Sequence, residues 1–315
     1  MKPIQKKVTR PHHHMTQKLK LGLVSKTFYY APVWAAVEQG YFADEQLDAE
    51  MAYTGSGVQI DALLNGNMDI AIAPPEGVLQ NAYAGGPLRL IAGNSGKLSH
   101  WLMARRGIKT IEDLRGRTFG ILNKVEGSFF HFQELAVKHN LHYPGDYGVQ
   151  DTGGAPSRHH ALLAGTLDAG LQSVPWCFLG EDLGLTKLAD ISDYVPDWQF
   201  NTVNANLHWC QKNPDTATAA LRALLRGVRW TYANREESAR ICARHMEIES
   251  KYTLRAWDYF TSLGKLTEDM RVNVPGLEKV IDAQIKAGLL PAEASGHLQR
   301  YVDQTWLDCV QPVMS

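Results

Sequence analysis

The sequence predicts an α/β protein built from two similar lobes, and three observations support this. The chain has 315 residues, of which 44% are apolar and 21% charged, so it is globular and long enough for two cores. Strand-like and helix-like segments alternate between residues 19 and 171, which is typical of parallel sheets covered by helices. The phrase Leu-Leu-x-Gly-x-x-Asp occurs at 63–69 and again at 162–168, which indicates a repeated unit.

The first unit shows its elements through hydrophobic period and glycine stops. LKLGLV alternates with a period of two, as a strand does, and glycines follow the helical stretches that end near 39, 65 and 84. We therefore expect strands at 19–24, 47–53, 68–73 and 88–92, and helices at 32–39, 58–65 and 75–84.

The second unit repeats this order at a nearly constant distance. It predicts strands at 117–122, 148–151 and 167–171 and helices at 128–139 and 157–164. Three anchors recur 98 positions later and a fourth 99 positions later, which requires a single inserted residue. The matching pairs are Gly22 with Gly120, Lys26 with Lys124, Thr54-Gly55 with Thr152-Gly153, and Gly66 with Gly165.

Two further strands are expected to connect the lobes. The segment 98–106 leaves the first lobe and 200–207 returns to it; helices follow at 214–234, 236–246, 253–263, 274–287 and 292–306. We expect a disordered preface at 1–17, lobe I at 18–100 together with 204–315, lobe II at 101–203, and a ligand cleft between the lobes.

Composition excludes several classes of protein. The net charge is −1 and no basic, aromatic-rich patch occurs, so nucleic acid is not an expected partner. No apolar run reaches the ~18 residues that cross a bilayer. The four cysteines have neither disulfide-scaffold nor zinc-site spacing and are expected as free thiols. We expect no cofactor, no metal and a monomer.

The N-terminus leaves the compartment open. Residues 1–10 are basic, but the apolar stretch of ~7–15 residues that a secretory leader needs does not follow. His12, His13 and His14 are better explained as a tag-like addition than as metal ligands. Either a leader was replaced and the mature protein starts near Met15, in which case it is periplasmic, or the protein is cytoplasmic.

A ligand in such a fold is expected at the carboxyl ends of the strands, where helix N-termini point outward. These loops contain aromatic residues, glycines, two lysines and two glutamates, one lysine and one glutamate from each lobe. The expected ligand-binding residues are Lys26, Phe28, Tyr29, Tyr30, Thr54, Gly55, Ser56, Gly57, Pro75, Glu76, Asn94, Asn123, Lys124, Glu126, Ser128, Gly153, Gly154, His159, Trp176 and Asn201.

Each group has a functional and a structural interpretation. Trp176 can sandwich a planar ligand, and Lys26 and Lys124 can pair with a carboxylate, sulfonate or phosphate, although exposed lysines are common. Glu76 and Glu126 can form a carboxylate pair across the cleft, or merely cap helices. Serines and glycines at helix starts are often caps and turns.

Catalytic motifs are not evident. The sequence has no GxSxG and no Walker-type loop, and its TGSG loop is not a dinucleotide fingerprint. His159 and His160 are neighbours on a helix, where directions differ by roughly 100°, so they do not converge on one metal.

Four segments resemble one family of solute-binding proteins, that of the nitrate/sulfonate/taurine importers. They are APVWAAVEQGYFADEQLDAEM, LLNGNMDIAI, IEDLRGRTFGI and NPDTATAALRALLRGVRWTYANREESARI, in that order between Lys18 and Leu290. The resemblance implies a type II periplasmic-binding-protein fold, a cleft that closes on a small molecule, and delivery to an ABC permease. The implied ligands include nitrate, sulfonates, taurine, aromatic acids and pyrimidine precursors.

Two functions remain open on this basis. The first is a binding protein whose lobes close on a small organic anion or aromatic acid, without any reaction. The alternative is a cytoplasmic enzyme of the same fold, an aromatic-acid decarboxylase or a pyrimidine-precursor enzyme, with His159, His160, Glu76 or Glu126 as acid or base. Against a pyrimidine synthase, Tyr30 stands where that group has a histidine, and only His208-Trp209-Cys210 resembles its cysteine-rich run.

Overall fold

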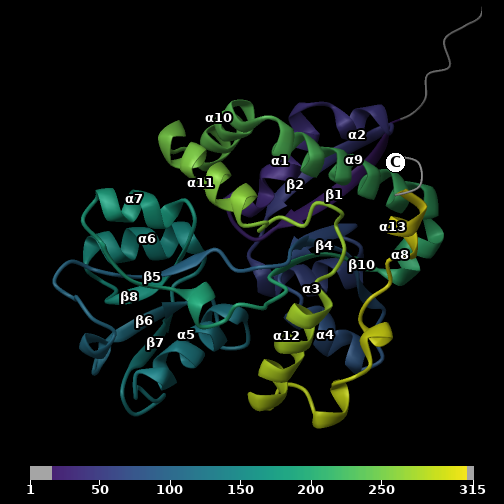
Figure 1. The fold of residues 1–315 in the computed structure, drawn as a ribbon. Coiled ribbons are helices and arrows are strands. Elements are labelled where there is room, and N and C mark those ends of the chain that lie inside the picture. Colours follow the sequence, from purple (N-terminus) through teal and green to yellow (C-terminus); the bar gives the residue numbers. More distant parts are fainter. Residues whose placement is uncertain (1–15, 311–315) are drawn as a thin grey trace, which may run out of the picture.

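A computed structural model describes residues 16–310 and shows two sheets side by side, each covered by helices (Figure 1). Most of the expected preface, including His12–His14, lies outside the described residues. The first sheet has the order β2(Leu47–Tyr53), β1(Gln17–Leu23), β3(Ile70–Ala73), β10(Asn201–Asn206), β4(Leu88–Ser95). The second has the order β7(Gly148–Asp151), β6(Thr118–Ile121), β8(Ala169–Ser173), β5(His100–Ala104), β9(Thr186–Asp190).

The two sheets have the same topology. In each, four strands run in the same direction, and the fourth position holds an antiparallel strand, β10 in the first sheet and β5 in the second. These antiparallel strands follow the two places where the chain passes between the sheets. The predicted repeat and both predicted crossings are therefore confirmed. We call residues 16–99 and 201–310 lobe I and residues 100–200 lobe II; the boundaries predicted from sequence fall within β5 and β10.

The helices lie close to their predicted positions. In lobe I the helices before the second crossing are α1(Ala31–Glu38), α2(Tyr41–Asp44), α3(Ser56–Asn65) and α4(Glu76–Tyr83), with the 3-10 turn η1(Phe28–Tyr30). Lobe II contains α5(Gly127–Lys138), α6(Ala155–Ala164) and α7(Trp176–Asp182), with the 3-10 turns η2(Glu112–Leu114) and η3(Ile191–Asp193). After β10 come α8(Leu207–Lys212), α9(Pro214–Ala233), α10(Arg235–Met246), α11(Ser250–Ser262), α12(Val274–Lys286), η4(Ala292–Ala294), η5(Leu298–Arg300) and α13(Thr305–Val310).

Glycines at matching positions explain why the Leu-Leu-x-Gly-x-x-Asp motif occurs twice. Gly66 and Gly165 end α3 and α6 in the left-handed conformation, with φ of 76° and 72°, which residues with a Cβ rarely adopt. Gly22 in β1 and Gly120 in β6 contact the residues that follow α3 and α6. A Cβ on Gly22 would come within 2.3 Å of the Met68 sulfur, and one on Gly120 within 2.4 Å of a Leu167 methyl.

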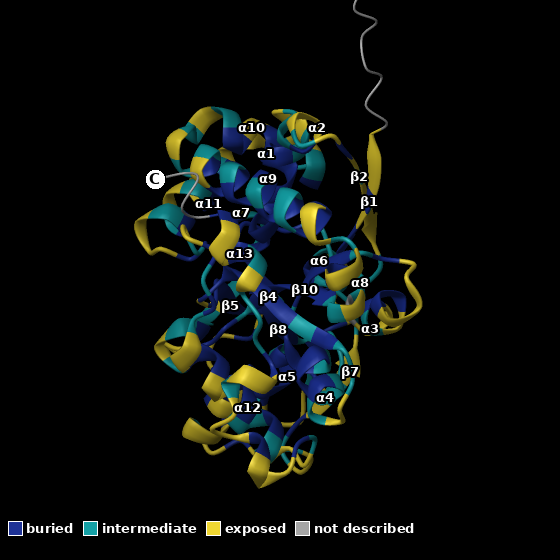
Figure 2. Cartoon of the chain, turned by 90° about the vertical axis from the view of Figure 1, so that its right-hand side faces the viewer, coloured by how far each residue is buried: buried dark blue, intermediate teal, exposed yellow. Residues whose placement is uncertain are grey.

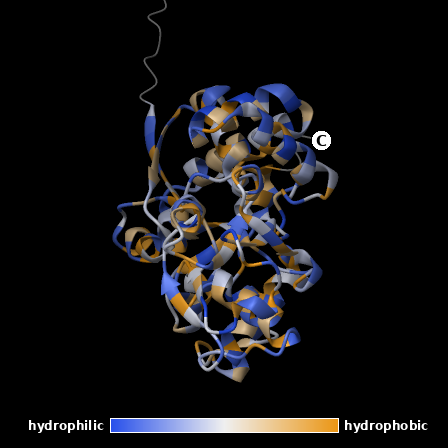
Figure 3. Cartoon of the chain, turned by 90° about the vertical axis from the view of Figure 1, so that its left-hand side faces the viewer, coloured by the Kyte–Doolittle hydropathy of each residue, from blue (hydrophilic) through white to orange (hydrophobic). Residues whose placement is uncertain are grey.

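Burial follows the layers of the two lobes. In Figure 2 the strands β4, β5, β8 and β10 are mostly dark, while exposed residues gather on the outer helices and turns. Figure 3 shows that the helices carry both hydrophilic and hydrophobic residues, as expected of helices that cover a sheet. No helix within residues 16–310 is long and apolar enough to span a membrane.

The predicted helix at 292–306 is wrong. Two short 3-10 turns, η4 and η5, lie in this segment, and a helix begins only at Thr305. Its backbone instead covers the edge of β4: the Leu90 N–H donates to Tyr301 O at 2.9 Å, and the Asp303 N–H donates to Leu90 O at 3.0 Å. Pairing with an otherwise open sheet edge satisfies backbone groups that a helix would satisfy internally.

The lobes are in contact with each other. Tyr252 and Tyr259 on α11 donate hydrogen bonds to Asp182 Oδ2 at 2.8 Å and to Asp190 Oδ2 at 3.2 Å in lobe II. Nearer the interlobe loops, a Cβ on Gly154 would lie only 3.0 Å from the Cβ of Ser25. The structure is therefore a closed arrangement of the two lobes.

Candidate functional site

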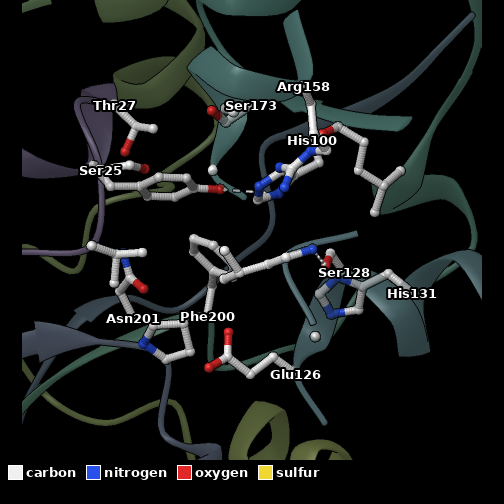
Figure 4. Close-up of a pocket in the computed structure, with 18 of the residues that line it drawn as sticks. Ser25, Thr27, His100, Glu126, Ser128, His131, Arg158, Ser173, Phe200 and Asn201 are labelled. Carbon is white, nitrogen blue, oxygen red and sulfur yellow. Dashed lines mark hydrogen bonds between the residues drawn. The ribbon is translucent and has the colours of Figure 1, made fainter. Parts of the chain in front are cut away.

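A cavity lies between the lobes at the carboxyl ends of β1, β3, β6 and β8, as the sequence predicts (Figure 4). About 60 Å³ of it is open to the centres of water molecules. Lobe I contributes Val24, Ser25, Thr27, Tyr29, Tyr30, Pro74 and Asn201. Lobe II contributes His100, Leu122, Glu126, Gly127, Ser128, His131, Gly154, Ala155, Arg158, Leu171, Ser173 and Phe200.

Arg158 places a positive charge in the wall of this cavity. It is only 4% exposed, and its guanidinium donates to the backbone carbonyls of Leu171, at 3.0 Å, and Gly153. No carboxylate within residues 16–310 forms an ion pair with it. Burial lowers the pKa of Arg158 to about 10, so it is still charged at neutral pH. A buried charge without a counter-ion is costly, and an anionic ligand would remove that cost.

Two helix N-termini point to the same cavity. The wall includes Gly127 and Ser128 at the start of α5, and Gly154 and Ala155 at the start of α6. Free N–H groups and the positive end of the helix dipole favour an anion there. Ser173, from the end of β8, is 1% exposed and its Oγ has no hydrogen-bond partner. In Figure 4 its hydroxyl lies on the same side of the pocket as Arg158.

The two histidines of the wall are uncharged at neutral pH. Burial, with a smaller contribution from the nearby Arg158 charge, lowers the pKa of His100 to about 3. Burial also holds the pKa of His131 well below its usual range, and the His131 Nε2 has no hydrogen-bond partner. The side chain of Asn201 is likewise buried, with an unpartnered Oδ1. His100, His131 and Asn201 therefore add uncharged hydrogen-bonding groups to the cavity wall, beside the charged guanidinium of Arg158.

The predicted carboxylate pair meets at the lobe interface. Glu126 lies in the cavity wall, whereas Glu76 lies behind it at 1% exposure, and neither of its carboxyl oxygens has a hydrogen-bond partner. A Cβ on Gly127 would be 3.2 Å from Glu76 Oε1, which shows how closely the lobes approach here. Burial, and then the charge of Glu126, raise the pKa of Glu76 to about 8, so Glu76 is largely protonated at neutral pH.

Of the residues expected from sequence, six line this cavity. They are Tyr29, Tyr30, Glu126, Ser128, Gly154 and Asn201. A seventh, Gly57, lines a smaller cavity that also includes Glu126. The expected role of these residues in binding stays a prediction, because the cavity shows their position and not a ligand.

The two lysines are placed differently from the expectation. The Lys26 ammonium forms an ion pair with Glu247, and that of Lys124 lies 5.7 Å from the centre of the Tyr143 ring. Neither side chain lines the cavity. Only the backbone of Lys26 takes part at the interface, because Trp176 Nε1 donates to its carbonyl at 3.0 Å.

Trp176 and His159 pack on each other and not on the cavity. Their ring centres are 5.3 Å apart, and the Trp176 side chain is buried. Both residues belong to lobe II, and Trp176 reaches lobe I through its hydrogen bond to the Lys26 carbonyl. Burial lowers the pKa of His159 to about 4, and its Nδ1 has no partner.

The remaining expected residues have structural contacts. Phe28 packs on Phe260 with ring centres 5.0 Å apart, and Asn94 donates to the Tyr29 carbonyl at 3.1 Å. Asn123 accepts from the Val125 N–H, and Gly153 accepts from Arg158. Thr54 donates to the Gly55 carbonyl, Gly55 has φ of 71°, and Pro75 precedes α4. The side chain of Ser56 lies outside the described part of the chain.

Sequence reasoning missed six polar residues of the wall. They are Ser25, Thr27, His100, His131, Arg158 and Ser173. Ser173 is the last residue of β8, and Arg158 directly precedes the expected His159. An arginine in the first turn of a helix that follows Gly-Gly is the one signal that could have been found. His100 and His131 lie inside a strand and a helix and carry no such signal.

The two lobes and the cavity between them define a class of fold, that of the periplasmic binding proteins. With the nitrate-binding protein NrtA of Synechocystis the TM-score is 0.79 at 14% identity, covering 96% of this chain and 90% of that one. With the aliphatic sulphonate binding protein SsuA of Escherichia coli it is 0.70 at 16% identity, covering 93% and 99%. At such identities the likeness shows the fold.

The chain belongs to the NMT1/THI5-like family, whose model matches residues 27–238. Among curated relatives, the candidate binding protein YtlA of Bacillus subtilis is 24% identical over 226 residues. That match covers 68% of this chain and 66% of YtlA, so this chain spans just under two thirds of that relative. The resemblance found in the sequence is thereby confirmed for fold and family.

Proposed function

We propose that the protein binds a small organic anion in the cavity between its lobes and presents it to an ABC permease for uptake. The observation that carries this proposal is Arg158, a buried guanidinium in the cavity wall without a carboxylate partner among the described residues. A sulfonate or carboxylate group there would accept hydrogen bonds from Arg158, from Ser173 and from the start of α6.

The mechanism is a shift between open and closed lobes. Arg158 belongs to lobe II, whereas Tyr29 and Asn201 of lobe I line the same cavity, so a ligand contacts both lobes only when they are closed. The ligand therefore stabilises closure by its difference in affinity for the two states. A permease that recognises the closed form would then receive loaded protein selectively.

The setting follows from the class of protein. Binding proteins that serve importers act outside the cytoplasmic membrane, and the compared NrtA and SsuA are described as periplasmic. We propose the same location for this chain, which would act there as a monomer. The ligands for which NrtA and SsuA are named, nitrate and sulphonate, together with Arg158, favour an oxyanion such as a sulfonate over a cationic ligand.

The test combines a ligand panel with two variants. Nitrate, ethanesulfonate, benzoate and succinate would be screened by thermal shift, and each hit titrated by calorimetry. We expect at least one anion to raise Tm, since a ligand that binds only the folded state stabilises it by mass action. Arg158→Met should weaken its binding at least about tenfold, because hydrogen bonds to charged groups contribute ~1.5–3 kcal/mol.

Lys124→Met is the matched control for charge. It removes a positive charge near the same lobe edge, from a side chain that does not line the cavity, and should leave affinity within about twofold. Circular dichroism of the empty Arg158→Met and Arg158→Lys variants shows whether each is folded. Equal anion binding by wild type and a folded Arg158→Met would overturn the proposal, as would a panel in which only uncharged or cationic compounds bind.

A further inference from the structure

A second, smaller cavity adjoins the ligand cavity on the side of lobe I. About 40 Å³ of it is open to the centres of water molecules, and Pro74 and Glu126 line both cavities. Its other walls come from α3, β3, β10 and the start of α4, and include Gln59, Gly77 and Asn204. The two cavities therefore adjoin at Pro74 and Glu126, and a ligand that occupied both would pass between these residues.

Gln59 is the unpaired polar group of this second cavity. It is 1% exposed, and neither its Oε1 nor its Nε2 has a hydrogen-bond partner. The amide of Asn204 is already used, since its Nδ2 donates to Ala73 O and its Oδ1 accepts from Thr202. An unpaired buried amide is destabilising because it has lost its hydrogen bonds to water, so a partner for Gln59 would be a substantial gain.

Position distinguishes Gln59 from a second glutamine in the same condition. Gln172 in β8 is also buried with both amide atoms unpaired, but it lines neither cavity. Of these two glutamines, Gln59 borders the cavity next to the ligand cavity, and Gln172 borders neither. This difference makes Gln172 a matched control for any effect of removing an unpaired amide.

The chemistry of an amide selects its partner. Gln59 presents an acceptor and a donor side by side, so only a group that offers a neighbouring donor and acceptor satisfies both. A carboxylate would pair with Nε2 alone and would add a negative charge in a cavity that Glu126 also lines. An ammonium would pair with Oε1 alone, and a hydrocarbon with neither atom.

We propose that the ligand carries, at the end opposite its anionic group, a primary carboxamide or an equivalent N–H and C=O edge, and that Gln59 binds this group in the second cavity. The inference rests on the proposed function, since Arg158 holds the anionic end. In Figure 4 Arg158 and Glu126 lie on opposite sides of the pocket, so the anionic end and the end near Glu126 are kept apart. Gln59 would then be a specificity-determining residue.

The experiment uses three isosteric anions that differ only at the far end. Succinamate ends in a carboxamide, levulinate in a methyl ketone and 4-methylpentanoate in a branched hydrocarbon; each is also tested one methylene longer and with a sulfonate head. Calorimetry with wild type should give the carboxamide an affinity about tenfold above both isosteres at one of these lengths, since hydrogen bonds contribute ~0.5–1.5 kcal/mol each. Gln59→Leu should bring all three within about twofold, whereas Gln172→Leu should preserve the preference.

Stability provides a second readout. Replacing an unpaired buried amide by an apolar group of similar shape is nearly neutral or stabilising, so the Tm of empty Gln59→Leu should equal or exceed that of wild type. The inference is overturned if wild type shows no preference for the carboxamide in any series of the panel. It is also overturned if Gln59→Leu keeps the preference, and in either case the ligand does not use the second cavity. If anions bind through Arg158 without such a preference, the proposed function stands and this inference fails. If no anion binds, or Arg158→Met changes nothing, the proposed function itself fails.

Discussion

Trp176 in lobe II donates a hydrogen bond from its Nε1 to the backbone carbonyl of Lys26 in lobe I, at 3.0 Å. This bond crosses between the lobes beside the cavity and exists only when they are closed. The bond therefore stabilises the closed arrangement of the lobes, as a ligand between them does, although Trp176 does not line the cavity. Two residues expected to bind the ligand are thus found to hold the lobes together.

Trp176→Phe should weaken ligand binding without removing a ligand contact. The loss of one neutral hydrogen bond costs about 0.5–1.5 kcal/mol, so affinity for any anion identified by the panel should fall about 2- to 12-fold. Trp257→Phe is the control, because Trp257 Nε1 donates to Thr231 O within lobe I, at 2.6 Å. That variant should lower the Tm of the empty protein and leave affinity unchanged. Unchanged affinity in Trp176→Phe would show that the bond does not contribute to closure.

The fold could be predicted because its signals are local. Helix ends such as Gly66 and Gly165, and the alternating pattern of the strands, depend only on residues close together in the sequence. The nearly constant offset between the two repeats then predicts the same elements in the second lobe. The helix predicted at 292–306 is wrong for the opposite reason. Its conformation depends on pairing with Leu90, which lies about 200 residues earlier in the chain and is brought near only by the fold.

The cavity could be predicted as a set of loops, but not as a set of side chains. Parallel strands fix which loops meet, whereas the direction of each side chain depends on partners distant in sequence. Lys26 turns to Glu247, a pairing between residues 221 positions apart. Arg158 and His159 are neighbours on α6, and a helix turns by roughly 100° per residue, so the residue that faces the cavity was missed by one position.

Glu76 should make stability depend on pH in a defined direction. Its pKa is about 8 in the folded protein, against an ordinary value of 4.5, so folding takes up a proton between these values. The destabilising effect of Glu76 is absent below about pH 4.5, grows by at most about 1.4 kcal/mol per pH unit as pH rises, and is complete above about pH 8.

Glu76→Gln isolates this contribution from other titrating groups. Urea unfolding at pH 5, 6, 7 and 8 should show the free energy of unfolding of the variant rising relative to wild type as pH increases. The exposed Glu236 provides the control, because its carboxyl forms a surface ion pair with Arg235, and Glu236→Gln should give a nearly constant difference over the same range. A Glu76→Gln difference that is equally flat would show that Glu76 is ionised in the folded protein.

The glycine of β6 should tolerate no side chain. Gly120→Ala would bring a Cβ within 2.4 Å of the Leu167 Cδ2, and Leu167 is 1% exposed in the hydrophobic core, so it has little room to move. Overpacking of this kind costs about 1–3 kcal/mol. Gly145→Ala is the control, because no atom lies within 4 Å of its added Cβ and its φ is not in the left-handed region. In denaturant unfolding, the free energy of unfolding of Gly120→Ala should be lower than that of wild type by this amount. That of Gly145→Ala should be close to the wild-type value. Equal stability of the two variants would mean that β6 and Leu167 are less closely packed, and the same substitution at Gly22 would then test whether lobe I differs from lobe II.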